Sequence, residues 1–267
     1  MKYHEFQFSK SLTDYIQTIW GMESESDEDI YPRSLIMPDG IVEIIFHYEK
    51  PFYTWQDDKQ FIKPENFAIS MMRKFIEIGS SGNTGFISVR FYPWGAYHFF
   101  SEPIQGFLDQ TIDAYRLWDN DSKMIISKIK KTETIEQRFK LIEDFLLEKL
   151  RQFQKDEVRV DSVLKLIRQT KGTLSIESIC TETGFSKKQL ERKFLSTVGT
   201  TPKMFSRITR FLNICQNLKE QRSQTLTQLT HDCGFYDQAH FIKEFKVFSG
   251  FTPKEFYERE NVFFSEI

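Results

Sequence analysis

The chain has 267 residues, of which 40% are hydrophobic and 28% charged, and its formal net charge is −2. This length and apolar content allow two ordinary hydrophobic cores. No segment approaches about 18 uninterrupted apolar residues, and the N-terminal sequence MKYHEFQFSK lacks the apolar core of a signal peptide. The sequence therefore argues against a membrane-spanning or secreted protein and predicts a cytoplasmic one.

The first part of the chain, residues 1–131, has the composition of a β-rich unit. Ile41 to Tyr48 (IVEIIFHY) and Phe86 to Tyr92 (FISVRFY) are typical of strands. Turn signals lie at residues 37–40 (MPDG) and 80–83 (SSGN). We expect a small β-barrel or β-sandwich.

Polar side chains inside these strands are the candidates for an effector pocket. Strand alternation places Glu43 and His47 on one face, and Arg90 and Tyr92 together on one face of the later strand. Trp94 is added because all four tryptophans lie in this region, where they indicate either core packing or an aromatic-lined pocket. The alternative for Glu43 and Arg90 is a structural ion pair on a solvated sheet face.

Nothing in the chain predicts a metal, a cofactor or catalysis. His4, His47 and His98 are scattered singly, whereas metal-binding β-barrels need several histidines and a carboxylate that converge. The sequence has no Gly-rich phosphate loop, no G-x-S-x-G and no H-E-x-x-H. Cys180, Cys215 and Cys233 lack C-x-x-C spacing, so we expect buried, reduced thiols.

A strong helix is predicted between the two parts, over Glu133 to Phe153 inside a linker segment of residues 132–155. Its apolar stripe, which Lys149 interrupts, is too wide for a lone exposed helix. The helix therefore packs back on the β-rich unit or against its copy in a homodimer. The chain divides near residues 155–157, and residues 156–267 form the second domain.

The second domain contains a repeat. Gly184-Phe185 recurs as Gly234-Phe235, a shift of 50, and later anchors recur with a shift of 51: Leu190, Phe194, Gly199, Thr201-Pro202-Lys203 and Phe205 match Phe241, Phe245, Gly250, Thr252-Pro253-Lys254 and Phe256. The extra residue falls where a turn enters a helix, so both copies keep one architecture.

Each copy is predicted to be a helix, a turn with Gly, a second helix, and a further helix opened by Thr-Pro. In the first copy Gly184 ends the first helix, and Ser186 with Gln189 forms the capping box of the next. This order is typical of a helix-turn-helix. Apolar residues at helical spacing from Phe205 to Leu218 predict one continuous helix behind Pro202 that joins the copies.

Charge supports a DNA partner for this domain. Residues 156–267 hold 17 Lys and Arg against 14 Asp and Glu, whereas residues 1–155 hold 19 against 24. The near-neutral total hides a basic C-terminal domain.

Residues from about Asp161 to Tyr257 resemble the DNA-binding domain of AraC/XylS-type transcription regulators, which has two helix-turn-helix units joined by a long helix. The segment GFYDQAHFIKEFKVFSGFTPKEFY, Gly234 to Tyr257, carries the family spacing. By this resemblance the base-reading residues are Lys188, Glu191 and Arg192 in the first unit and Gln238, Ala239, Ile242 and Lys243 in the second. Lys243 stands where the family usually has Arg, which weakens the expected guanine contact.

Residues expected near phosphates are helix N-terminal groups and basic side chains: Ser186, Lys187, Lys193, Lys203, Arg207, Arg210, His240 and Lys246. The resemblance also implies a cupin-like sensor domain at the N-terminus. The prediction is a two-domain α+β regulator that binds double-stranded DNA, dimerises and responds to a small-molecule effector. Two alternatives remain, a regulator whose first domain binds a protein partner and an architectural DNA-binding protein without effector.

Overall fold

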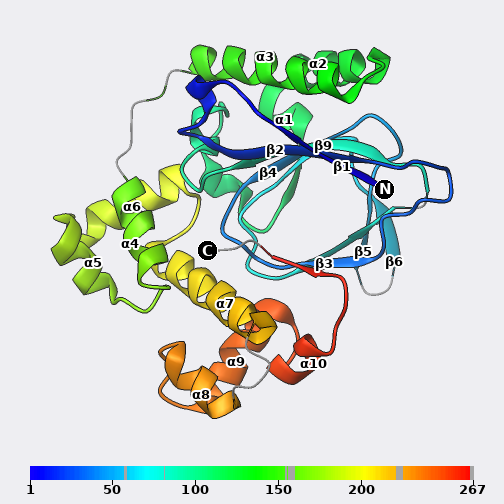
Figure 1. The fold of residues 1–267 in the computed structure, drawn as a ribbon. Helices are drawn as coiled ribbons and strands as arrows, with labels where there is room; N and C mark the ends of the chain where they lie inside the picture. Colours follow the sequence, from blue (N-terminus) through cyan, green and yellow to red (C-terminus); the bar gives the residue numbers. More distant parts are fainter. Residues whose placement is uncertain (57–58, 81, 154, 156–159, 221–224, 265–267) are drawn as a thin grey trace.

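The computed structural model describes residues 1–267 except 57–58, 81, 154, 156–159, 221–224 and 265–267. Its N-terminal part is built from two facing β-sheets and three helices, and its C-terminal part is helical (Figure 1). None of the helices within the described ranges has the length and apolar character needed to cross a bilayer.

The described strands form two sheets, which we call sheet A and sheet B. Sheet A has the spatial order β1 (Lys2–Phe6), β2 (Ile16–Glu23), β9 (Gly85–Phe91), β4 (Glu43–His47), β7 (Asn66–Ile69) and β10 (Thr111–Asp113). Sheet B has the order β11 (Val262–Phe263), β3 (Ser34–Ile36), β8 (Ile76–Gly79), β5 (Tyr53–Gln56) and β6 (Lys59–Ile62). No described strand pairs across the two sheets, so the sandwich alternative is correct and the closed-barrel alternative is wrong.

The central strands of sheet A are buried on both faces. On one face Ile44 and Val89 share a core with the helices α1 (Ala114–Trp118), α2 (Asn120–Lys131) and α3 (Ile135–Phe153), which lie over this face in Figure 1. On the other face Ile45 and Phe86 share a core with Ile78 of sheet B. The alternation expected from the sequence is present, but neither face of the sheet is fully solvated.

Helix α3 packs back on its own sheet, which is one of the two expected arrangements. Phe139, Ile142 and Leu146 are buried in the core that contains Ile44. Lys149, which interrupts the apolar stripe, is 1% exposed and donates hydrogen bonds to Asp121 of α2 and to Gln152. The division predicted near residues 155–157 falls mostly outside the described residues.

The C-terminal part contains seven helices within the described residues: α4 (Asp161–Gln169), α5 (Ile176–Thr183), α6 (Lys187–Thr197), α7 (Pro202–Glu220), α8 (Leu226–Asp232), α9 (Gln238–Ser249) and α10 (Pro253–Tyr257). Helix α7 is the predicted joining helix. Thr-Pro opens both α7 and α10, and the Thr201 hydroxyl accepts a hydrogen bond from Met204 N at 3.1 Å. Three short 3₁₀ turns, η1 (Lys10–Leu12), η2 (Ala96–His98) and η3 (Ile104–Phe107), lie in the N-terminal part.

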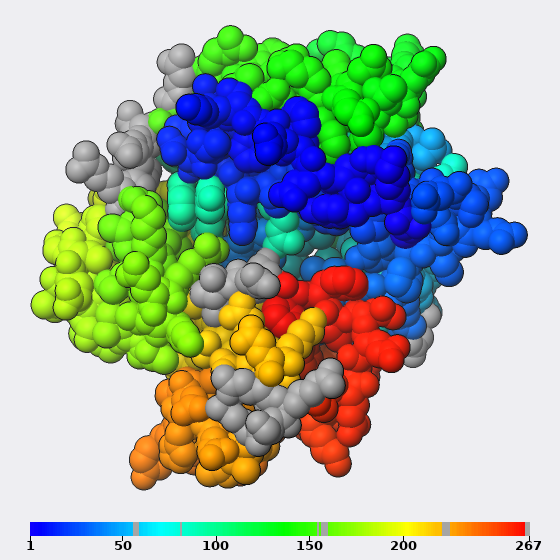
Figure 2. Space-filling model, viewed as in Figure 1, coloured from blue at the N-terminus to red at the C-terminus, as the bar shows by residue number. Residues whose placement is uncertain are grey.

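The two parts share one hydrophobic core. Leu35, Met37 and Met71 of the N-terminal part are buried together with Phe205 and Ile208 of α7. The Phe75 backbone N–H donates a hydrogen bond to the carbonyl of Phe248 in α9 at 3.2 Å. In the space-filling view the C-terminal segment lies against the N-terminal surface (Figure 2). The N-terminal part is therefore held against both α7 and the second unit of the repeat.

Candidate nucleic-acid interface and effector cavity

The first unit of the repeat, α5 and α6, has the local structure that the sequence predicts. Gly184 ends α5 with a left-handed backbone, φ 74°, which a side chain with a Cβ disfavours. The Ser186 hydroxyl accepts from Gln189 N and the Gln189 side chain accepts from Ser186 N, so the capping box is formed. Leu190 and Phe194 of α6 are fully buried. This burial fixes which face of α6 is left outside.

The outer face of α6 carries the three predicted base-reading residues. Lys188, Glu191 and Arg192 are all exposed, and so is Lys187 at the first helical position. Arg and Lys are the side chains that donate to guanine O6 and N7 in the major groove, and Glu accepts from cytosine N4. The exposed face of α6 therefore carries donors and an acceptor suited to base edges.

The second unit, α8 and α9, repeats this arrangement with one more residue in the turn. The Asp237 side chain caps α9 by accepting from His240 N at 2.8 Å, where Ser186 caps α6. Phe241 and Phe245 are fully buried. A further capping box, Thr225 with Gln228, opens α8 and was missed from the sequence.

The predicted base readers of the second unit lie on the outer side of α9. Gln238, Ala239 and Lys243 are exposed and Ile242 is half-buried. Tyr236, the residue before the N-cap of α9, is 92% exposed. The sequence did not predict it as a candidate DNA contact. The change in the repeat shift from 50 to 51 could have indicated this residue. It shows that the turn of the second copy holds one extra residue, which has no buried counterpart in the first copy.

The two units and helix α7 together line a cleft of about 740 Å³. Its lining includes Lys187 and Glu191 from the first unit, Lys203 and Arg207 from α7, and His240 from the second unit. Candidates from both copies are thus brought together around one hollow. Lys188, Arg192, Gln238, Ala239, Ile242, Lys243 and Lys246 lie outside this lining.

Several predicted phosphate-contacting residues have partners inside the protein. Arg207 donates to both carboxylate oxygens of Glu244 in α9, with Nη2 to Oε2 at 3.0 Å. Arg210 donates to the Gly172 carbonyl at 2.8 Å, and burial lowers its pKa. The Lys193 ammonium lies 5.5 Å from the Phe185 ring centre. Lys187, Lys203 and Lys246 are exposed on the surface.

The five predicted pocket residues divide among three places. Glu43 and Arg90 line a cavity of about 180 Å³ between the two sheets. His47 lies in the core beside it, in ring contact with Phe52 and Phe67. Tyr92 and Trp94 stack on each other, with centroids 4.8 Å apart, and line a separate cleft near Lys155.

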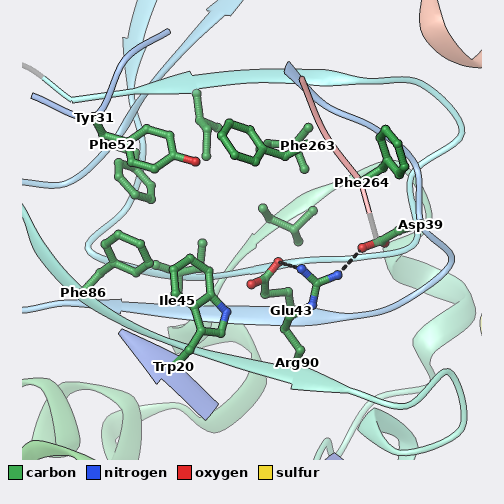
Figure 3. Close-up of a pocket in the computed structure, with 13 residues that line it drawn as sticks. Trp20, Tyr31, Asp39, Glu43, Ile45, Phe52, Phe86, Arg90, Phe263 and Phe264 are labelled. Atoms are coloured by element: carbon green, nitrogen blue, oxygen red, sulfur yellow. Dashed lines mark hydrogen bonds and ion pairs between the residues drawn. The ribbon is translucent and has the colours of Figure 1, made fainter. Parts of the chain in front are cut away.

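The cavity between the sheets has an aromatic body and a charged end (Figure 3). Its lining consists of Trp20, Tyr31, Ile36, Asp39, Glu43, Ile45, Phe52, Ile69, Ile78, Phe86, Arg90, Phe263 and Phe264. Arg90 binds Asp39, and its Nη1 lies 3.9 Å from Glu43 Oε2. The Ser88 hydroxyl donates to Glu43. The expected pairing of Glu43 with Arg90 is present, but on a face covered by sheet B and not on a solvated face.

Two of the groups that line the cavity, Arg90 and Tyr31, have shifted pKa values. Burial opposes the charged form of Arg90, but the Glu43 and Asp39 carboxylates outweigh it and raise the pKa of the guanidinium. Burial raises the pKa of Tyr31 to about 12, so the phenol stays protonated at neutral pH. Among the described residues no group of His, Cys, Asp and Glu is placed to hold a metal ion.

Two family models match separate parts of the chain. Residues 4–113 match a domain of unknown function, DUF6597, and residues 179–259 match a helix-turn-helix domain. The chain is 29% identical over 94 residues to the HTH-type transcriptional regulator ArgR of Pseudomonas aeruginosa, an alignment that covers 35% of this chain and 28% of that protein. The aligned part of the chain thus spans little more than a quarter of the length of this curated relative.

Structural alignments with two solved proteins extend over most of the chain. ToxT of Vibrio cholerae is 12% identical, with 96% of this chain and 98% of that chain covered and a TM-score of 0.46. The AraC-like transcriptional activator CuxR is 15% identical, with 80% and 86% covered and a TM-score of 0.27.

Proposed function

The C-terminal domain of this chain belongs to the AraC-type helix-turn-helix domains, and we propose that the protein is a transcription regulator that binds specific sites in double-stranded DNA. One observation carries the proposal. Two capped helix-turn-helix units, joined by the continuous helix α7, each leave the polar face of the second helix exposed. This family and fold belong to DNA-binding proteins and not to enzymes.

Each unit has a different role in sequence selection. Lys188, Glu191 and Arg192 supply most base contacts from α6, because they offer charged donors and an acceptor. Gln238, Ala239, Ile242 and Lys243 read the second element, where Gln pairs with adenine and Ala and Ile contact thymine methyl groups. Because α7 joins the units rigidly, the two elements lie roughly 34 Å or about one helical turn apart on one face of the duplex.

Phosphate contacts hold the protein in register. We assign them to the exposed lysines, Lys187, Lys203 and Lys246, and to the helix N-termini at Ser186 and His240. Lys193 belongs to the same surface. Arg207 and Arg210, which bind Glu244 and Gly172 within the protein, hold α7 against its neighbours. Arg210 also adds positive charge to the cleft, whereas the charge of Arg207 is balanced by Glu244.

The N-terminal domain is proposed to be a cupin-like sensor for a small-molecule effector. The support is the cavity at Glu43 and Arg90, which is lined mostly by the β-rich unit assigned to residues 1–131. Residues 132–155 link it to the DNA-binding domain of residues 156–267. An effector acts by shifting the population between DNA-competent and incompetent arrangements of the two parts.

We further propose a homodimer in the cytoplasm, where the protein has access to DNA. Two copies would place two DNA-binding domains on repeated sites. Because the apolar stripe of α3 packs on its own sheet, the contact between copies must use another surface. Light scattering of the full chain, alone and with a two-site duplex, measures this state directly.

The test is the selection of bound sequences from a random duplex pool by the full chain and by Arg192→Ala. We expect the full chain to select a site with two elements about one turn apart. In Arg192→Ala one of these elements should lose base preference, with a loss of about 1–3 kcal/mol in binding free energy. Arg151→Ala is the control, since Arg151 is an exposed arginine on α3. Failure of the unaltered chain to enrich any sequence would overturn the proposal.

A further inference from the structure

The C-terminal tail, residues 261–264, returns from the DNA-binding domain to the N-terminal domain. It adds β11 to sheet B beside β3 as a parallel strand, seen in red in Figure 1. Leu35 N donates to the Asn261 carbonyl and Met37 N to the Phe263 carbonyl, both at 2.9 Å. Without the tail, β3 would be an edge strand with unpaired N–H groups.

The same tail forms part of the wall of the cavity between the sheets. Phe263 and Phe264 line it together with Tyr31 and Ile36, and the Phe263 ring lies 6.3 Å from that of Tyr31 (Figure 3). Val262 is buried, whereas Phe263 is 46% exposed. The cavity is therefore built jointly by the two domains.

The tail is held to the N-terminal domain by few interactions. Strand β11 has two residues, and the tail is tied back to its own domain by Lys219 Nζ, which donates to the Val262 carbonyl at 3.2 Å, and by Phe264 against Phe256. A strand this short contributes little stability by itself. A molecule that fills the adjacent cavity can therefore change the stability of tail docking.

We propose that this cavity is a binding site for a small, uncharged aromatic molecule with one hydroxyl group, and that such a molecule fastens the tail to sheet B. The ligand contacts Phe263 and Phe264 only while the tail is docked. By linkage, a ligand that binds the docked arrangement more tightly must strengthen docking by the same factor. The tail thereby reports occupancy of the cavity to the DNA-binding domain.

The size of the cavity and its aromatic walls set the body of the ligand. An apolar cavity of about 150 Å³ is enough to bind benzene, and this one has about 180 Å³. A single ring with one or two small substituents fits that space. Trp20, Phe52 and Phe86 offer ring faces and edges to it.

The charged end sets the polar group. Asp39 and Glu43 are both paired with Arg90, so a ligand carboxylate or ammonium would have to displace part of this ion-pair network to gain a partner. Either ion would lose its water without a partner of its own. A hydroxyl avoids this cost because it can donate to a Glu43 oxygen or accept from Arg90.

This inference goes beyond DNA binding and depends on the proposed function only for its effect on transcription. Four probes of one shape are titrated into the full chain by calorimetry: p-cresol, toluene, benzoate and benzylamine. We expect p-cresol to bind most tightly, toluene more weakly, and the two ions not at all. Absence of p-cresol binding, or tighter binding of either ion, would overturn the assigned ligand.

Fastening of the tail is measured separately. Hydrogen exchange of the Leu35 and Met37 amides, whose acceptors lie in the tail, should slow when p-cresol is bound. Phe263→Ala should weaken p-cresol binding at least about 5-fold, whereas Phe61→Ala, an aromatic of similar exposure on β6, should not. Binding with unchanged exchange, or with equal affinity for Phe263→Ala, would overturn the coupling.

The two proposals fail in different ways. A chain that selects a DNA site but binds no p-cresol contradicts only the cavity assignment. A chain that binds p-cresol with slowed exchange but enriches no DNA sequence contradicts only the regulator function.

Discussion

The guanidinium of Arg207 and the carboxylate of Glu244 join the helix between the two units to the second recognition helix. Both Nε and Nη2 of Arg207 donate to Glu244, and the side chains are 31% and 20% exposed. A two-point pair of this kind fixes orientation as well as distance. It therefore sets the orientation of α9 relative to α7, and through α7 its orientation relative to α6.

Removing this pair should loosen the second unit. Glu244→Gln is expected to lower the free energy of unfolding by about 1–3 kcal/mol, because a charge-assisted pair is lost from a half-buried place. Asp161→Asn is the matched control, since its exposed pair with Lys165 at 3.7 Å should contribute at most about 0.5 kcal/mol. Urea unfolding of both variants measures the difference. Equal losses would mean that the Arg207 pair does not anchor α9.

Lys243→Arg should sharpen base selection by the second unit. Lysine is a single point donor, whereas the arginine fork can reach guanine O6 and N7 together. We expect a gain of about 1–3 kcal/mol in discrimination at one base position, without a change at positions read by α6. Competition binding with single-base variants of the selected site measures this. An equal gain at every position would show that only phosphate attraction had changed.

Lys203→Ala should weaken binding to all sequences alike. An exposed lysine that neutralises one phosphate contributes about 0.9 to the slope of log affinity against log salt. The slope is expected to fall by about 1, with no change in base preference. Lys131→Ala, at the end of α2, serves as the control. An unchanged slope for Lys203→Ala would remove this residue from the phosphate set.

His47 should make stability depend on pH. Its Nδ1 lies 3.0 Å from the Glu65 carbonyl and its Nε2 accepts from Phe52 N at 3.3 Å, which fits the neutral ring. Burial lowers its pKa from 6.5 to about 4. The unfolded chain therefore binds more protons than the folded one between these values, so stability is complete above about pH 6.5 and falls as the pH drops towards 4.

The slope from this group is at most about 1.4 kcal/mol per pH unit. Thermal unfolding of the protein and of His47→Gln between pH 4 and 7 tests it, with His231→Ala, an exposed histidine, as the control. The pH dependence should flatten in His47→Gln only. If it remains, another group is responsible.

Two glycines allow the contact between the domains to be measured. Gly184 and Gly250 both end a helix with φ near 75°, but a Cβ on Gly184 would meet nothing within 4 Å, whereas one on Gly250 would lie 2.6 Å from Phe75 Cε1. Gly184→Ala should lose about 1–2 kcal/mol from backbone strain alone. Gly250→Ala should lose more, and Phe75→Ala in that background should recover part of the difference. Equal losses in the two single variants would argue against a tight domain contact.

The local structure of the C-terminal domain follows from its sequence because its signals act over a few residues. The Ser186 and Gln189 capping box and the Thr-Pro openings of α7 and α10 depend on hydrogen bonds that span three residues. The repeat then placed Leu190 and Phe194 inward, and their burial left Lys188 and Arg192 exposed. Local chemistry and helical period were sufficient for this domain.

The environment of the β-rich domain was decided by contacts between distant residues. Alternation placed Glu43 with His47 on one face of their strand and Arg90 with Tyr92 on one face of the later strand, but no sequence signal showed that sheet B covers Glu43 and Arg90. Tyr92 and Trp94 do not line the cavity, because β9 ends at Phe91 and the chain then turns towards another cleft. A strand pattern fixes which side chains share a face and not what lies opposite.

By itself, the sequence determined the repeated helix-turn-helix units, their caps and the residues that they expose. Only the tertiary structure decided that α3 packs on its own sheet and that Val262 and Phe263 pair with Leu35 and Ile36. Caps and helical faces arise from residues within one or two turns of each other. The pairing of β11 with β3 joins segments more than 200 residues apart in sequence, so it depends on how the C-terminal helices pack against the N-terminal part.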